Sequence, residues 1–265
     1  MIAEEQALAP DREATEHRTL QDALARFPAD RSHHLRVLAR LRGVTPIPDD
    51  ASLLDVGAAQ GSAVITWLHE GLKGFGVEPS EEARVVAERL AEHQGVTIEL
   101  RPGLAEELPW EACQFDVVHA EYVLEHVLDA QKTFEEAYRV LKPGGVFWFA
   151  TASSVSPRQD EIDGFPCFGW YPDRLKRRIM AWARDKKPHL VGHTQYPAMN
   201  WFSPWKARRM LRQAGFRRIY DRWDLRLPSE GGRLYQVVLR FIRLCAVTKF
   251  AADVLVPCCA YAAIK

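Results

Sequence analysis

SLLDVGAAQG, residues 52–61, decides the fold, because an apolar strand leads directly into a short loop that contains two glycines. Gly57 allows the backbone to turn with a positive φ. Gly61 allows the following helix, which begins near Ser62, to approach a ligand without a Cβ in the way. Asp55 stands two residues before the first glycine. This stretch predicts a nucleotide-binding loop at the head of an α/β sheet.

Strand-like and helical segments alternate from residue 52 to residue 151. The apolar runs are SLLDVG (52–57), GFGVE (74–78), TIELR (97–101), FDVVHA (115–120) and VFWFAT (146–151). The segments between them are mostly helical, and Ser80 and Asp129 are suited to cap two of these helices. Alternation of this kind is typical of βαβ units and predicts a parallel sheet. A helix over 203–214, a strand over 216–224 and a last strand over 258–264 are expected to follow.

The spacing of the glycines separates two kinds of nucleotide site. A dinucleotide site needs Gly-x-Gly-x-x-Gly, so that backbone amides close on a pyrophosphate. Here three residues separate Gly57 from Gly61, and Asp55 precedes them. A carboxylate would repel a pyrophosphate but would suit a ligand with ammonium and sulfonium charges. An NAD-dependent oxidoreductase, the chief alternative enzyme, is therefore disfavoured.

At these residues the chain resembles the class I S-adenosylmethionine (SAM)-dependent methyltransferases, whose first motif reads (Asp/Glu)-x-Gly-x-Gly-x-Gly. Ala59 stands where the middle glycine usually falls, a substitution that is tolerable where φ is negative. Glu78 ends the second strand 23 residues after Asp55. In the family, the acid at that strand end accepts hydrogen bonds from both ribose hydroxyls.

Two further segments extend the resemblance. GLAEELP (103–109) resembles the family's adenine-binding Gly-Asp-Ala-x-x-Leu-Pro, with Leu104 in place of the acid, so adenine contact is left to the Ala105 amide and Glu106. FDVVHAEYVLEHV (115–127) and YRVLKPGG (138–145) resemble the ubiquinone/menaquinone-type small-molecule methyltransferases. The resemblance is strong over about 50–151 and holds in outline elsewhere.

The resemblance implies a Rossmann-like fold with a seven-stranded, mostly parallel sheet and helices on both faces. A single domain over 1–265 would comprise an N-terminal helical cap (1–50), a SAM-binding core (51–151), a substrate lid inserted after the fifth strand (152–202) and a C-terminal helix and strand pair (203–265) with an inserted apolar helical segment over 231–256. The cofactor is SAM and its product S-adenosylhomocysteine. The residues expected to bind it are Asp55, Gly57, Ala59, Gly61, Glu78, Pro79, Ala105, Glu106 and Glu121.

Methyl transfer from SAM is an in-line displacement at an activated carbon, so the protein mainly aligns donor and acceptor and needs no metal. A hydroxyl acceptor benefits from a general base, and the candidates are His126 and His193, although a lone histidine is more often packed or solvated. His33 and His34 are adjacent on a helix and point about 100° apart. With no third ligand evident, we expect surface residues there and no metal site.

Charge is polarised along the chain. Residues 151–265 hold 21 of the 35 Lys and Arg but 9 of the 35 Asp and Glu, a balance of +12 against −12 in residues 1–150. This pattern indicates either two differently solvated faces or a basic pocket for an anionic substrate or lipid headgroup. The segment 152–202 is rich in proline and aromatic residues, which suits a substrate lid and equally a lid packed on the core.

The remaining features of the sequence limit which partners and which cellular compartment are expected. The start lacks the pattern of a signal peptide, and the five cysteines show no CxxC spacing, so a cytoplasmic, reduced protein is expected. Charges interrupt the apolar stretch 234–256, which leaves peripheral membrane contact open but no spanning helix. Nucleic-acid methylation is disfavoured, because the basic residues form no evident stripe. The oligomeric state is not indicated.

We therefore expect O-methylation of a small-molecule, sugar- or lipid-linked acceptor, which carries an anionic group in one version of the hypothesis. The alternatives are C- or N-methylation of a natural product, and a methyltransferase fold that keeps SAM as a structural ligand or catalyses a cyclisation.

Overall fold

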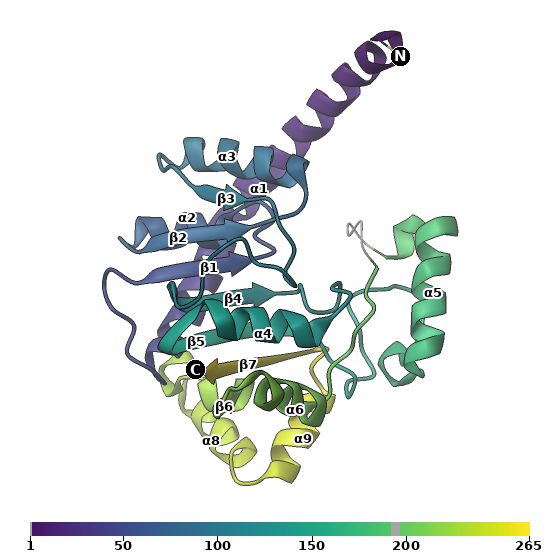
Figure 1. Cartoon of the computed structure of the whole chain (residues 1–265). Coiled ribbons are helices and arrows are strands. Elements are labelled where there is room, and N and C mark those ends of the chain that lie inside the picture. The colour runs from purple at the N-terminus through teal and green to yellow at the C-terminus, as the bar shows by residue number, and fades with distance from the viewer. Residues whose placement is uncertain (1, 192–196) are drawn as a thin grey trace.

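A computed structural model describes residues 2–191 and 197–265, and its centre is one twisted sheet (Figure 1). Five strands are parallel: β1 (Ser52–Val56), β2 (Lys73–Val77), β3 (Glu99–Arg101), β4 (Phe115–Glu121) and β5 (Leu141–Ala152). β6 (Arg218–Asp221) and β7 (Cys258–Ile264) complete the order β3-β2-β1-β4-β5-β7-β6, with β7 antiparallel to both of its neighbours. The predicted seven-stranded, mostly parallel sheet is confirmed.

Helices cover both faces of this sheet, which explains why its central strands are continuous apolar runs. On one face lie α1 (Ile2–Arg42), α2 (Ser62–His69) and α3 (Glu81–His93), and on the other lie α4 (Ala130–Val140) and α6 (Pro204–Ala214). The predicted helix starts are confirmed by side-chain caps: Ser80 accepts from the Ala83 amide, Asp129 from the Lys132 amide and Ser203 from the Lys206 amide.

Residues 152–202, which we call the lid segment after the role expected from the sequence, contain η1 (Phe168–Trp170), α5 (Asp173–Lys186) and η2 (Pro188–Leu190). Figure 1 shows α5 beyond the arrowheads of β1 and β4, the edge where parallel α/β sheets bind ligands. Phe168 and Trp201 are buried in a small core of this segment's own, and the buried Lys176 ammonium lies 4.1 Å from the centre of the Trp201 ring. Part of the aromatic content therefore holds the lid segment together.

The C-terminal region continues through α7 (Arg222–Leu225), η3 (Pro228–Glu230), α8 (Arg233–Ile242) and α9 (Ala246–Val254). The strand expected over 216–224 is shorter, because the Asp221 side chain accepts from the Trp223 and Asp224 amides and starts α7. In the described ranges, no helix has both the length and the apolar character that crossing a membrane requires.

Candidate cofactor and catalytic site

The loop after β1 is built as the glycine spacing predicts. Gly57 and Gly61 adopt left-handed φ angles of 71° and 73°. A Cβ on Gly57 would lie 2.5 Å from Val123 Cγ2, so a side chain cannot be added there without movement. The Gly57 and Ala58 amides donate to the Val77 carbonyl at 2.8 and 3.0 Å, which ties the loop to the end of β2. Gly61 then begins α2 without a side-chain cap, so the first-turn amides face the loop.

Ala59 does not have the negative φ that would make it an easy replacement for glycine. Its substitution for glycine was acceptable with a negative φ, but its φ is +45°. The reason is a contact from the next strand: the Ala59 amide donates to Glu78 Oε2 at 2.9 Å, which fixes the loop in the left-handed conformation. The loop therefore carries backbone strain at a residue that has a Cβ.

Replacing Ala59 by glycine should raise the free energy of unfolding by about 1 kcal/mol, because the left-handed region is roughly 1–2 kcal/mol unfavourable for an L-residue and the extra entropy of glycine offsets only part of that. Denaturant unfolding of the two proteins measures the difference. Ala58→Gly, at a neighbour without a positive φ, is the matched control and should be destabilising. An Ala59→Gly protein no more stable than the parent would contradict the strain.

Glu78 lies at the carboxyl end of β2 and faces the loop. Its side chain is 9% exposed, and while Oε2 accepts from Ala59, Oε1 accepts from the Ser80 amide at 2.9 Å. Each carboxylate oxygen keeps a free lone pair for a hydroxyl donor. The Pro79 carbonyl accepts from Arg84 Nη1 at 3.0 Å, which stabilises the turn into α3. The ribose role of Glu78 stays a prediction, and the position of the carboxylate suits it.

Asp55 is engaged inside the protein. Its buried carboxylate accepts from His119 Nδ1 at 2.7 Å, and the two residues are directly opposite each other on β1 and β4. His119 Nε2 lies 3.6 Å from a Glu121 oxygen. Glu121 also accepts from His33 Nε2, at 2.8 and 3.0 Å, and from Trp148 Nε1 at 3.3 Å. Asp55 and Glu121, both predicted to contact the cofactor, thus belong to one buried ionic network.

The electrostatics of this network centre on His119. Burial alone would lower its pKa, but the attraction and hydrogen bond of Asp55, joined by Glu121, raise it to about 10. Burial would raise the pKa of Glu121, yet the nearby charge of His119 and the hydrogen bond from His33 hold that pKa well below the usual range. Burial also raises the pKa of Asp55, so His119 holds its proton at neutral pH in the short contact with Asp55, next to the ionised Glu121.

The expectation that no third potential metal ligand lies near His33 and His34 on α1 is wrong. The sequence offered no third ligand beside His33 and His34, but the fold brings Glu121 to them, with one potential ligand atom of each within 4.8 Å of the others. The reason is the packing of α1 across the end of β4, 88 residues away in the chain. His33 already donates to Glu121, and the buried His34 Nε2 lies 3.1 Å from Ser62 Oγ, so hydrogen bonding accounts for the contacts in the structure.

The adenine-binding segment and the loop after β4 are connected. Glu106 Oε1 accepts from the Leu128 and Asp129 amides at 2.8 and 3.3 Å, so this side chain holds the loop after β4. Ala105 is buried and Leu104 is 58% exposed. Contact of Ala105 and Glu106 with adenine stays a prediction.

The structure describes one of the two histidines that the sequence offers as a general base. His126 lies in the loop after β4, partly buried, and its amide donates to the Val123 carbonyl at 2.9 Å. Its catalytic role stays a prediction. His193 lies outside the described residues.

Glu125 is a candidate that sequence reasoning missed. It is 1% exposed, its Oε2 accepts from Thr151 Oγ1 at 2.7 Å, and its carbonyl accepts from the Met199 amide of the lid segment at 2.6 Å. Burial raises its pKa to about 7, and the charge of Glu161 adds to the effect. Burial also raises the pKa of Glu161 to about 7. A carboxyl group with such a pKa at this edge of the sheet is suited to proton transfer at neutral pH.

The residues fit the cofactor class expected from the sequence. The left-handed glycine loop leaves no room for added side chains, α2 starts with uncapped amides, and Glu78 offers acceptors at the next strand end. Together they place hydrogen-bonding groups suited to a nucleoside at the carboxyl ends of β1 and β2. The network of Asp55 and Glu121 lies behind this loop, on the α1 side of the sheet.

Known proteins match this core. Residues 54–149 match a family model described as a methyltransferase domain. The uncharacterized methyltransferase YcgJ of Bacillus subtilis is 32% identical over 114 residues, which cover 43% of this chain and 44% of that protein. The ubiquinone biosynthesis O-methyltransferase of Azorhizobium caulinodans is 33% identical over 119 residues, covering 45% of this chain and 44% of that protein. The matched part thus spans less than half of either relative.

A solved structure extends the likeness of the fold. Phosphoethanolamine N-methyltransferase 2 of Haemonchus contortus, in complex with SAM, superposes with a TM-score of 0.55 at 18% identity, covering 86% of this chain and 52% of that one. At this identity the likeness shows the fold alone. The sequence match over residues 54–149 shows that this segment is similar to a methyltransferase domain, and the superposition extends the same fold over most of the chain.

Proposed function

We propose that this chain transfers a methyl group from SAM to the oxygen of a small-molecule acceptor that is linked to a sugar or a lipid. The observation that carries the proposal is the loop of Gly57 and Gly61 facing Glu78, within a segment that matches the methyltransferase domain. SAM supplies an electrophilic methyl group on a sulfonium. The protein has to hold the nucleoside, align the acceptor and exclude water.

The holding groups come from β1 and β2. In this proposal, Glu78 accepts hydrogen bonds from the ribose hydroxyls, and the amides at the start of α2 lie against the ligand. The lid segment covers the same edge of the sheet, where α5 extends beyond the strands (Figure 1). Its contact with Glu125 through the Met199 amide connects the cover directly to the loop after β4.

Glu125 is the group that we propose removes the acceptor's proton. Its pKa of about 7 makes it a base near neutral pH and an acid able to release the proton afterwards. An oxygen acceptor needs this help more than an amine does, because a neutral hydroxyl is a weak nucleophile. For this reason the proposal places O-methylation ahead of N-methylation.

Replacing Glu78 by alanine should weaken SAM binding by about 10- to 100-fold, the size expected from losing charge-assisted hydrogen bonds worth roughly 1.5–3 kcal/mol. Isothermal calorimetry with SAM and with S-adenosylhomocysteine measures the effect. Glu81→Ala, an exposed acid three residues further on, is the matched control and should bind normally. Unchanged affinity in Glu78→Ala would remove the basis of the proposal.

The acceptor class has its own test. Protein with SAM labelled in the methyl group is incubated with cell extracts separated into lipid, small-molecule, protein and RNA fractions. Label in the lipid or small-molecule fraction supports the proposal, and mass-spectrometric fragmentation that places the labelled methyl group on an oxygen supports O-methylation. Label confined to protein or RNA contradicts it. Binding of SAM without formation of S-adenosylhomocysteine in any fraction would instead favour a structural ligand.

A further inference from the structure

The two helices inserted before β7 present an unusual surface. Four side chains on one face of α8 follow the spacing i, i+3, i+4, i+7 and are 47–78% exposed: Leu234, Val237, Val238 and Phe241. An amphipathic helix normally turns such a face toward the core. Here the described part of α8 has a single buried residue, Leu239, on another side of the helix. The apolar face of α8 therefore points outward.

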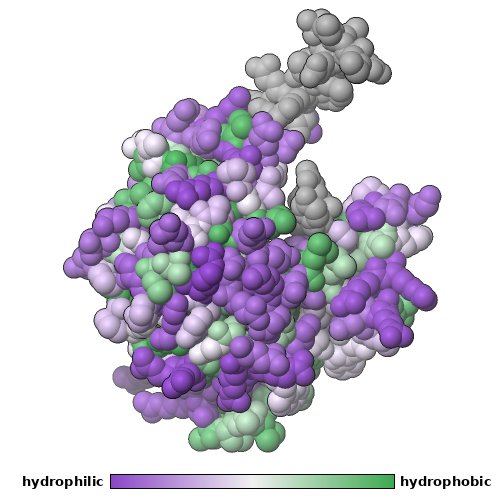
Figure 2. Space-filling model, in the orientation of Figure 1, coloured by the Kyte–Doolittle hydropathy of each residue, from purple (hydrophilic) through white to green (hydrophobic). Residues whose placement is uncertain are grey.

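The same surface continues beyond α8. Leu244 in the connection, Val247 in α9 and Leu255 after it are 71–76% exposed. Figure 2 shows hydrophobic atoms gathered at the lower pole of the molecule, where Figure 1 places the turn between α8 and α9. We call the exposed apolar residues of α8, together with Leu244, Val247 and Leu255, the apolar tip. Exposed apolar patches of this kind mark interaction surfaces.

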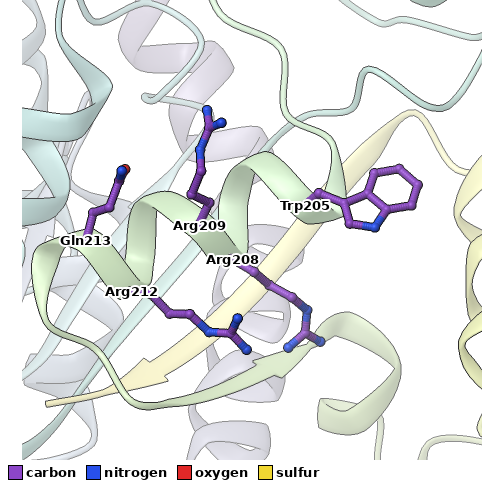
Figure 3. Close-up of a pocket in the computed structure, with 5 residues that line it drawn as sticks. All are labelled: Trp205, Arg208, Arg209, Arg212 and Gln213. Carbon is purple, nitrogen blue, oxygen red and sulfur yellow. The ribbon is translucent and has the colours of Figure 1, made fainter.

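Basic groups flank the apolar tip. Arg233 and Arg240 are exposed and seven positions apart, so both lie along one edge of the outward face of α8. A second basic region lies on α6, where Trp205, Arg208, Arg209, Arg212 and Gln213 line an open pocket of about 390 Å³. Figure 3 shows Arg208 and Arg212 on one side of α6, Arg209 on the other and Trp205 at the start of the helix.

Trp205 joins the pocket to the tip. Its ring is 68% exposed and lies 5.6 Å from the ring of Phe250 on α9, centre to centre. The pocket and the tip are thus parts of one surface that combines apolar side chains, an interfacial tryptophan and arginines.

The acids near this surface are engaged elsewhere. Asp221 accepts from Arg208 and Lys249, Asp224 also accepts from Lys249, and Asp253 accepts from Trp223 Nε1 at 2.7 Å. Arg209 and Arg212 are exposed on α6. Over residues 204–218 the sequence has six basic residues and no acid. The charge available to a partner is therefore positive.

We propose that the apolar tip and the arginine pocket of α6 form a docking surface for membranes that contain anionic phospholipid. The apolar tip enters the boundary between headgroups and acyl chains, while Arg209 and Arg212 bind lipid phosphates. An amphipathic helix with a basic edge and no capacity to span the bilayer is the usual form of such a contact. The positive flank disfavours pairing of this surface with a second copy of itself.

Co-sedimentation with vesicles tests the proposal on the full chain. Vesicles of phosphatidylcholine mixed with phosphatidylglycerol should bind the protein, and vesicles of phosphatidylcholine alone should bind it far more weakly. Val237→Ser/Phe241→Ser should lower binding at least tenfold. Arg209→Gln/Arg212→Gln should lower it roughly fivefold for each arginine and make the remainder less sensitive to salt.

The matched controls lie on α5, whose residues Trp182 and Arg178 are also exposed. Trp182→Ser and Arg178→Gln should leave vesicle binding unchanged. Circular dichroism checks that each variant is folded, which is expected because every changed side chain is at the surface. Equal binding to both kinds of vesicle, equal loss in the α5 variants, or no binding at all would overturn the proposal. So would concentration-dependent dimerisation in sedimentation velocity that Val237→Ser/Phe241→Ser abolishes while vesicle binding stays absent.

Discussion

Replacing His119 by leucine is expected to lower the free energy of unfolding by about 3–5 kcal/mol, the usual effect of removing one partner from a buried ion pair. The variant leaves Asp55 buried without the donor that lies 2.7 Å from its carboxylate. It also removes the charge next to Glu121, whose pKa is held low partly by His119. Guanidinium unfolding followed by circular dichroism measures the loss.

The double variant Asp55→Val/His119→Leu separates the charge effect from lost packing. It replaces both partners with apolar side chains, and should recover at least half of the loss, since the desolvated carboxylate is no longer present. A single variant that loses less than 1 kcal/mol, or a double variant as unstable as the single, would mean that the pair contributes little.

The pH dependence gives a third readout. The folded protein raises the pKa of His119 from 6.5 to about 10. The folded state then holds a proton that the unfolded state releases, so the contribution of His119 is complete below about pH 6.5 and is lost as the pH rises through about 10. His119→Leu should remove this decline. A decline of equal size in the variant would assign it to other groups.

Much of the fold could be predicted from local patterns. The alternation over residues 52–151 predicted the parallel strands, because burial on both faces makes each strand a continuous apolar run. Helix caps and turn residues mark the segments between the strands. The position of Glu78 opposite the glycine loop follows from the pairing of β1 with β2 alone. The positive φ of Ala59 could not be predicted from the sequence, because it depends on the hydrogen bond from the Ala59 amide to Glu78.

The ionic network could not be predicted because it needs register and long-range packing. Asp55 meets His119 only because β1 pairs with β4 so that these two residues are opposite each other. His33 meets Glu121 only after α1 has packed on the sheet. Sequence reasoning therefore assigned Asp55 and Glu121 from the family motif, without their partners.

The burial of Glu125, in the loop after β4, also could not be predicted from the sequence. Glu125 directly precedes His126 in the sequence, and the histidine was the residue predicted as the general base. Its raised pKa results from burial, and the lid segment contributes to its surroundings through the Met199 amide, 74 residues away in the chain. Burial of an acid beneath a distant segment leaves no local signal, so a buried carboxyl group is recognised only in the folded chain.

Replacing Glu125 by glutamine should lower kcat for an oxygen acceptor by about 100- to 10,000-fold, the usual contribution of a general base. SAM affinity should change little, because the holding groups lie on β1 and β2. In the parent protein, kcat should rise with pH through about 7 as Glu125 loses its proton, and the residual activity of Glu125→Gln should not follow that curve. Rapid-quench kinetics over pH 5–9, once an acceptor fraction has been identified, measure both effects.

Glu161→Gln is the matched control, because burial gives Glu161 a similar pKa of about 7. The charge of Glu161 raises the pKa of Glu125, so this variant should keep most of its kcat and shift the midpoint of the pH profile to lower pH. His126→Gln separates the neighbouring candidate in the same series. If His126→Gln flattens the profile while Glu125→Gln keeps it, the histidine is the base, and the buried carboxyl group is a structural part of the contact between the loop after β4 and the lid segment.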